Sequence, residues 1–323
     1  MTNARRRRPF SRLAERAVGS LLFRNVTLQP RLVARMRREA AALGASLADV
    51  IDVWADLRRQ FHQSLIHGDP AEFLRWPPVE RSMVKRSHQR ARPELIHLRE
   101  RPDWRRRWWS AVRETTIGRP RPLPRCPWSS ANTIYQAYHA CRFEEATGRS
   151  LASMRTILEF GGGYGRFCHL AHDLGFRGTY VIYDLPEVAV LQRFYLRHVG
   201  LTVSEGREAT WPARGVVTVV DANDLTALLR QRPRGEAPFV AVSSLSEAPL
   251  ALRDTVLAAV TSFDAFLIHY AALHDALDNR AYFARWRTAL TDHDWADVQI
   301  PHLEKSTAYL FGHRRVSGGP KAP

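Results

Sequence analysis

The sequence predicts an α/β fold: a doubly wound sheet preceded by a mainly helical N-terminal region. From residue 156 onward, short apolar runs alternate with segments of helical periodicity. The first apolar run ends in a glycine-rich turn at 161–165, and the second ends at Asp184. A strand, a glycine turn, a helix, a second strand and then a carboxylate form the arrangement by which an open α/β sheet binds a nucleoside.

Charge divides the chain into two regions. Lys and Arg outnumber Asp and Glu by 30 to 14 in residues 1–150, whereas residues 151–323 carry 18 of each. The whole net charge of +16 therefore lies in the first half. We expect a basic, mainly helical region at 1–125, which serves as a lid or makes substrate or oligomer contacts, and a ligand-binding domain at 126–323.

The N-terminal region is expected to form amphipathic helices. Leu32, Met36, Ala40 and Leu43 share one face of a helix at the spacing of 3.6 residues per turn. Prolines are frequent in 119–127, which predicts an extended linker before the second region.

Strands and helices are expected to alternate after this linker. Phe167, Leu170, Ala171 and Leu174 recur at helical spacing, and Gly175 is suited to end that helix. The expected strands are 156–160, 179–183, 216–220, 239–242 and 263–268, and the helices are 166–174, 186–199 and about 276–290. An antiparallel pair at 295–300 and 306–311 completes the sheet and predicts one reversed strand at its edge.

The glycine turn has the pattern Glu159-x-Gly161-x-Gly163-x-Gly165. A dinucleotide site requires G-x-G-x-x-G, and a P-loop requires a lysine followed by Ser or Thr, so the turn matches neither. The pattern resembles motif I of class I S-adenosylmethionine (SAM) dependent methyltransferases. Over roughly 130–312 the chain is similar to the bacterial sugar O-methyltransferase family in four segments: Ile157–Arg166, Tyr183–Glu187 with Tyr195 and Leu196, Ser243-x-x-Ser246-Glu247, and Asp278–Phe283.

This resemblance implies a Rossmann-like, seven-stranded methyltransferase sheet with SAM as its cofactor. Eight residues match the positions that would contact the cofactor: Glu159, Gly161, Gly163, Gly165, Asp184, Asp221, Ser243 and Tyr135. The glycines would allow close backbone approach, Glu159 would orient the turn or bind the amino group, and Asp184 would hold the ribose. Asp221 would accept from the adenine amino group, and Tyr135 would close over the methionine end.

The chemistry implied is an attack by an acceptor oxygen on the methyl group of the sulfonium. A sugar or alcohol hydroxyl is a poor nucleophile at neutral pH, so a general base is expected. The loops after the fourth and fifth strands lie beside the cofactor at the carboxyl edge of the sheet. We therefore expect the base to be Glu247 or His269, with His274 as the next candidate.

Composition argues against several other classes. Only three of the 48 basic residues are lysine, and no zinc finger or RNA-binding motif accompanies the arginines, so nucleic acid is the less favoured partner. Three cysteines without paired spacing suggest neither a disulfide framework nor a metal site. The arginine run at 5–8 precedes no apolar segment, and no window has the composition of a membrane span, so a cytoplasmic location is expected.

The sequence thus predicts a cytoplasmic, bacterial methyltransferase that O-methylates a sugar or a related small molecule in glycan or secondary-metabolite biosynthesis. A homodimer is compatible with this prediction. One alternative is an N- or C-methyltransferase of a natural product. A different class of protein is the second alternative: a nucleic-acid-associated protein with a methyltransferase-like scaffold domain.

Overall fold

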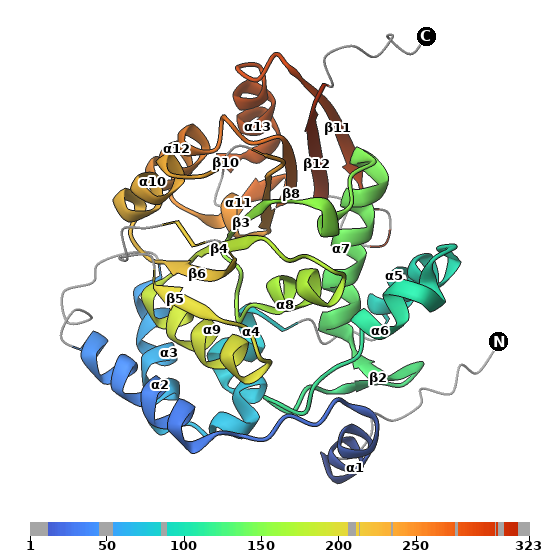
Figure 1. The fold of residues 1–323 in the computed structure, drawn as a ribbon, viewed down its shortest axis with the longest axis vertical. Helices are drawn as coiled ribbons and strands as arrows, with labels where there is room; N and C mark the ends of the chain where they lie inside the picture. The colour runs from blue at the N-terminus through green and yellow to red at the C-terminus, as the bar shows by residue number, and fades with distance from the viewer. Residues whose placement is uncertain are drawn as a thin grey trace.

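The computed structural model describes residues 12–44, 54–84, 89–205, 211–212, 214–233, 235–274, 277–300, 302 and 307–315. An eight-stranded sheet lies at its centre, with the strand order β11-β12-β8-β7-β3-β4-β6-β5 (Figure 1). The strands of this sheet are β3 Thr156–Phe160, β4 Thr179–Tyr183, β5 Val203–Glu205, β6 Gly215–Val219, β7 Pro238–Val242, β8 Ala265–Ala271, β11 His293–Gln299 and β12 Thr307–Arg314. Two short antiparallel pairs lie outside it: β1 Pro122–Leu123 with β2 Cys126–Ser130, and β9 Leu273–His274 with β10 Leu277–Asp278.

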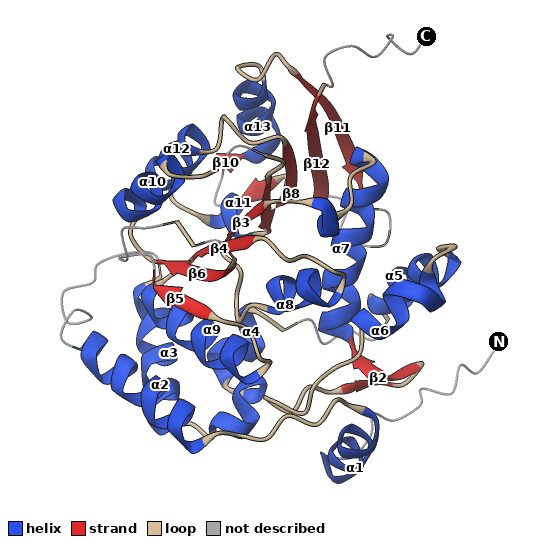
Figure 2. Cartoon of the chain, viewed as in Figure 1, coloured by secondary structure: helices blue, strands red, loops and turns tan. Residues whose placement is uncertain are grey.

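Helices make up most of the N-terminal region and cover both faces of the sheet (Figure 2). Before β1 the α-helices are α1 Arg12–Leu22, α2 Pro30–Leu43, α3 Ala55–His67, α4 Pro77–Ser82, α5 Ala91–Glu100 and α6 Trp109–Ala111. After β2 they are α7 Ala131–Thr147, α8 Arg166–Asp173, α9 Pro186–His198, α10 Ala222–Arg230, α11 Ser244–Glu247, α12 Leu250–Ala259 and α13 Asn279–Arg287. Short helices of other types are Pro70–Arg75, Trp104–Trp108 and Leu151–Ser153.

The central strands are apolar on both sides because helices cover both faces of the sheet. β3 and β4 are fully buried and pair in parallel, with Ile157 opposite Tyr180 and Leu158 opposite Val181. Successive side chains of a strand point to opposite faces, so these two pairs belong to two separate apolar clusters.

The two clusters define the layers of the molecule. One contains side chains of α7, α8 and α9, and the other contains side chains of α10, α12 and α13, which lie on the opposite side of the sheet (Figure 1). The first cluster also includes Met36, Phe61 and Phe73 from the N-terminal region. These helices therefore pack on the core that supports β3, although the predicted division at residue 125 stays a prediction.

The predicted fold class is confirmed, with two corrections to the sheet. It has eight strands rather than seven, because the short β5 pairs with β6 at one edge. The reversed strand is not at the edge: β12 lies between β8 and β11 and is antiparallel to both. A strand pattern gives no information about which partner the strand inserts beside, since that depends on packing between distant segments.

Two local predictions are also wrong. The segment 119–127 is not a linker, because it contains β1 and the first residues of β2, and Leu123 and Cys126 are buried. The fifth predicted strand continues to Ala271, so His269 lies within β8 instead of following it. Among the described residues, no helix combines the length and the apolar character that crossing a bilayer requires.

Many N-terminal arginines form ion pairs within the molecule. Arg24 donates to Asp173 at the end of α8, and Arg58 on α3 donates to Glu187 on α9 through Nε at 3.0 Å and Nη2 at 3.1 Å. On α2, Glu39 accepts from Arg193 of α9 at 2.8 Å. Charged side chains of both signs in the first half therefore attach it to α8 and α9.

Candidate functional site

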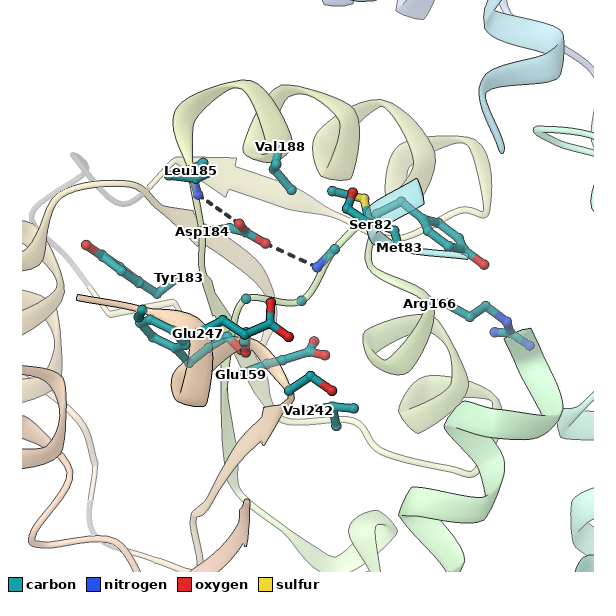
Figure 3. Close-up of a pocket in the computed structure, with 18 of the residues that line it drawn as sticks. Ser82, Met83, Glu159, Arg166, Tyr183, Asp184, Leu185, Val188, Val242 and Glu247 are labelled. Carbon is teal, nitrogen blue, oxygen red and sulfur yellow. Dashed lines mark hydrogen bonds between the residues drawn. The ribbon is translucent and has the colours of Figure 1, made fainter. Parts of the chain in front are cut away.

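A cavity of about 260 Å³ lies at the carboxyl ends of β3, β4, β6 and β7 (Figure 3). This is the point where the strand order reverses, since β4 lies on one side of β3 and β7 on the other. Such a switch point is the usual ligand site of a doubly wound sheet. The lining residues that follow the strands are Gly161, Gly162, Gly163, Tyr164, Asp184, Leu185, Val220, Ser243 and Ser244.

The glycine turn has the backbone that the motif predicts. Gly161 has a φ of +68°, and a Cβ added there would lie 2.2 Å from the Cβ of Ser244. A side chain at Gly161 is therefore excluded by conformation and by space. Gly163, with a φ of +57°, lies under Met83, since an added Cβ would be 3.5 Å from the Met83 Cγ. Gly165 has a φ of +94° but does not line the cavity; it allows close packing against Leu196.

Asp184 is held against the glycine turn. Its Oδ2 accepts hydrogen bonds from the Gly163 N–H at 3.1 Å and from Gln192 Nε2 at 2.8 Å, and its Oδ1 accepts from the Leu185 N–H at 2.8 Å (Figure 3). Burial nevertheless raises the pKa of Asp184 to about 7, because these hydrogen bonds lower it by less than desolvation raises it. The carboxyl is thus oriented for a ligand and is poorly compensated for its charge.

Two further carboxyls, those of Glu159 and Glu247, point into the cavity (Figure 3). Glu159 on β3 is buried and accepts a hydrogen bond from the Tyr180 hydroxyl at 2.8 Å. Burial raises its pKa to about 8, and the nearby charge of Asp184 contributes. Glu247, at the end of α11, is half-buried.

Arg166 is the one cationic side chain that lines this cavity among the described residues. Its guanidinium is engaged elsewhere: Nε donates to the Thr133 Oγ1 at 2.8 Å, and Nη2 donates to the Ala111 carbonyl at 3.3 Å. Burial raises the pKa values of both Glu159 and Asp184, so the negative charge of these two carboxyls is poorly compensated, which makes the cavity suitable for a positively charged ligand.

Helix α7 and the N-terminal region close the cavity. The Ser130 hydroxyl accepts from the Thr133 N–H and caps α7, which then presents Asn132, Tyr135 and Gln136 on one face at helical spacing. The cover from the N-terminal region consists of Trp54, Leu57, Phe61, Ser82 and Met83, which come from α3, α4 and the residues next to them. Sequence reasoning suggested a lid from this region but named none of these residues, and it missed Gln192, because no local pattern shows which segments reach the cavity.

The predicted site residues are only partly brought together. Glu159, Gly161, Gly163, Asp184, Ser243, Tyr135 and Glu247 all line the cavity. Asp221 is exposed next to Val220, and its Oδ1 caps α10 by accepting from the N–H groups of Asn223 and Asp224. His274 lies on the short strand β9, outside the lining. His269 is buried behind the wall, and its Nδ1 is 3.0 Å from the Ser243 Oγ. The roles assigned to all of these residues stay predictions.

One group of side chains away from the cavity has metal-ligand chemistry. Donor atoms of His97, Cys141 and Glu145 lie within 4.8 Å of one another. Two arginines also contact the carboxylate of Glu145, Arg101 at 2.8 Å and Arg142 at 3.2 Å. The positive charges of these two arginines disfavour the binding of a metal cation at this carboxylate.

No family model and no curated protein matches the sequence. Similar solved structures include the mitomycin 7-O-methyltransferase MmcR, which is 12% identical, with 85% of this chain and 72% of that chain covered and a TM-score of 0.38. An O-methyltransferase family protein from Burkholderia thailandensis is 13% identical, with 58% of this chain and 60% of that chain covered and a TM-score of 0.37. Magnesium protoporphyrin IX methyltransferase (ChlM) from Synechocystis PCC 6803, solved with bound SAM, is 10% identical, with 56% of this chain and 80% of that chain covered and a TM-score of 0.38. At such low identities and scores, these similarities assign this chain no activity.

Proposed function

We propose that this chain is a SAM-dependent methyltransferase that transfers a methyl group to a hydroxyl of a sugar or a related small molecule. The observation that supports this proposal is the convergence of Glu159, Asp184 and Glu247 around a glycine turn at the switch point of a doubly wound sheet. The cysteines are free thiols, which is consistent with a reducing compartment such as the cytoplasm.

SAM fits the charge of the cavity. Its sulfonium and ammonium groups would favour the ionised forms of carboxyls whose pKa values burial raises, to about 8 for Glu159 and about 7 for Asp184. A pyrophosphate would place further negative charge beside these carboxylates, and like charges in a partly buried site repel strongly. The same cavity therefore disfavours a dinucleotide.

The residues present can divide the work of binding. Asp184 keeps room for about one more hydrogen bond beyond its present three, since a carboxylate offers about four lone-pair positions, and it would accept one from a ribose hydroxyl. Glu159 and Glu247 would face the cationic end. When bound, SAM supplies an electrophilic methyl group, so the chain must mainly align the acceptor and exclude water. The apolar cover of Trp54 and Met83 with their neighbours would exclude it.

An acceptor hydroxyl must also lose its proton. Glu247 lines the cavity and can take this proton directly, whereas His269 reaches the cavity only through Ser243. We propose that either Glu247 or His269 serves as the general base, and that His274, which lies outside the cavity lining, does not.

Calorimetry of the purified chain tests the cofactor. SAM and S-adenosylhomocysteine are expected to bind with micromolar affinity, and NAD is not expected to bind. Asp184→Ala should weaken SAM binding by about 1.5–3 kcal/mol, the range for hydrogen bonds to a charged group, whereas Asp56→Ala, at a carboxylate 87% exposed on α3, should leave it unchanged. Binding of NAD without heat from either SAM species would refute the proposal. Full affinity in Asp184→Ala would place the ribose elsewhere.

The ion pairs of the N-terminal arginines lead to a second expectation. Arginines paired with carboxylates, as Arg24 and Arg58 are, are not available to bind phosphates. Binding of random RNA or DNA should therefore be weak at physiological salt in a filter-binding assay. A tight complex whose log affinity falls steeply with log salt would indicate many phosphate contacts and favour the nucleic-acid alternative.

A further inference from the structure

Ser243 has an unusual backbone conformation at the wall of the cavity. Its φ is +68° and its ψ is −37°, a region that residues with a side chain rarely adopt. Apart from Arg119 it is the one non-glycine residue with positive φ in the described part of the chain. Strained residues of this kind persist where surrounding contacts hold them, and they concentrate at functional sites.

Four contacts hold Ser243 in this conformation. Its N–H donates to the His269 carbonyl at 2.8 Å, and its own carbonyl accepts from the Ser246 hydroxyl at 2.7 Å. Its Oγ lies 3.0 Å from the His269 Nδ1 and is also hydrogen-bonded to the Tyr135 hydroxyl. The hydroxyl of a cavity-lining residue is thus fixed between a buried imidazole and a buried phenol.

His269 is 3% exposed and is enclosed by aromatic and titratable side chains. From α7, the ring centroids of His139 and Tyr135 lie 5.1 and 6.2 Å from that of His269, and from β12 the Tyr309 ring lies at 5.4 Å. His139 Nδ1 and the Tyr309 hydroxyl are hydrogen-bonded to each other. Of the carboxyls that line the cavity, that of Glu247 is the nearest to Ser243 along the chain. Ser243 therefore connects the cavity to this buried cluster.

We propose that Ser243 and His269 form a proton relay for the methyl acceptor, an inference that rests on the proposed function. As the acceptor oxygen bonds to the methyl carbon and the carbon–sulfur bond breaks, the acceptor O–H proton passes to the Ser243 Oγ. The proton of Ser243 passes at the same time to the His269 Nδ1, which leaves a neutral serine and an imidazolium.

Charge is conserved in this step and stays close to the cavity. Methyl transfer would remove the positive charge of the sulfonium, and the relay would place one on His269, which contacts the cavity-lining Ser243. The total charge near the cavity therefore changes little, which limits the free-energy cost of protonating a buried imidazole. Ser243 is the catalytic residue in this relay, because it would touch the acceptor, and His269 acts through it.

Two substitutions of Ser243 test the relay, because both remove the hydroxyl but differ in their effect on the backbone. Ser243→Ala and Ser243→Gly both remove the hydroxyl, and the glycine variant also removes the backbone strain of the positive φ, which offsets part of the loss of the hydroxyl's hydrogen bonds. Methyl transfer from radiolabelled SAM is measured in single turnovers to alkyl alcohols, methyl glycosides and phenols of graded acidity. Both variants should transfer about 10²–10⁴-fold more slowly to the alcohols, with SAM affinity retained.

The dependence on acceptor acidity separates a relay from a structural role. An acidic phenol needs little help to ionise, so the loss in both Ser243 variants should shrink as acceptor acidity rises. His269→Gln should show the same trend, and the double variant Ser243→Ala/His269→Gln should lose no more than either single variant. His172→Gln, at a half-buried histidine on α8 outside the cavity, serves as the control.

Three outcomes overturn the relay. The first is transfer to alcohols within threefold of wild type by both Ser243 variants. The second is an acidity-dependent loss in Glu247→Gln but not in the Ser243 variants, which would make the carboxylate the base. The third needs no acceptor: NMR of labelled histidine rings showing that neutral His269 carries its proton on Nδ1, where it cannot accept one from Ser243. Absence of SAM binding by the wild type would instead refute the proposed function.

Discussion

Replacement of Glu187 by glutamine is expected to lower the free energy of unfolding by about 3–5 kcal/mol, the cost of removing one partner from a buried ion pair. The side chain of Glu187 is 1% exposed in the first turn of α9, and that of Arg58 is 12% exposed on α3. Both oxygens of the carboxylate are used, at 3.0 and 3.1 Å. The neutral amide would remove the negative charge that faces the partly buried guanidinium of Arg58. Urea denaturation should show a lower midpoint with an unchanged slope.

A double variant provides the matched control for this prediction. Glu187→Gln/Arg58→Met removes both charges and keeps an aliphatic side chain at position 58, so most of the lost stability should return. Because Leu57 and Phe61 flank Arg58 on α3 and line the cavity, the single variant should also weaken SAM binding. A loss below about 1 kcal/mol, the value of an exposed pair, would contradict the prediction.

The second large effect is on pH dependence. Burial raises the pKa of Asp184 to about 7 and that of Glu159 to about 8, above the ordinary values that these groups regain on unfolding. The folded protein therefore holds these protons more tightly, so the associated stability is present below about pH 4 and is lost as pH rises through about 7–8. Since a difference of one in pKa corresponds to about 1.4 kcal/mol, the ligand-free chain should lose several kcal/mol of stability between pH 5 and pH 9. Chemical denaturation across this range measures the loss.

Neutral isosteres and the cofactor give the controls for the pH prediction. Glu159→Gln and Asp184→Asn should each flatten the pH dependence, and Glu159→Gln should stabilise the ligand-free chain at pH 9. A cationic ligand favours the ionised carboxyls, so SAM should bind more tightly as pH rises from 6 to 8 and should release protons on binding. Calorimetry in buffers of different ionisation enthalpy detects this release; proton uptake at pH 7 would mean that the two carboxyls do not face the cationic groups.

Local features of the sequence were sufficient to predict the central strands of the sheet. The predicted strands 156–160 and 179–183 coincide with β3 and β4, and Pro186 starts α9 as expected. These features could be predicted because apolar periodicity and proline geometry act over a few residues. The glycine turn belongs to the same class, since the positive φ values of Gly161 and Gly163 are a local requirement.

The candidate site could be predicted mainly where it is built from residues near the carboxyl ends of the strands. Asp184 and Glu247 reach the cavity because parallel strands end at a common edge. Asp221 follows the same rule in sequence, yet its side chain caps α10, since an aspartate next to a helix start satisfies the free N–H groups there. His269 lies behind the cavity wall instead of in a loop beside it, because β8 extends three residues beyond the predicted end.

The sequence by itself determined the fold class, the glycine turn and the carboxyl at the end of the second strand, because each depends on short-range periodicity and turn geometry. Only the tertiary structure decided that β12 inserts between β8 and β11, that Trp54 and Met83 cover the cavity, and that Ser243 separates His269 from it. These features join segments that are far apart in the chain. They depend on which apolar faces and ion pairs pack together across the whole molecule, and local periodicity carries no information about that choice.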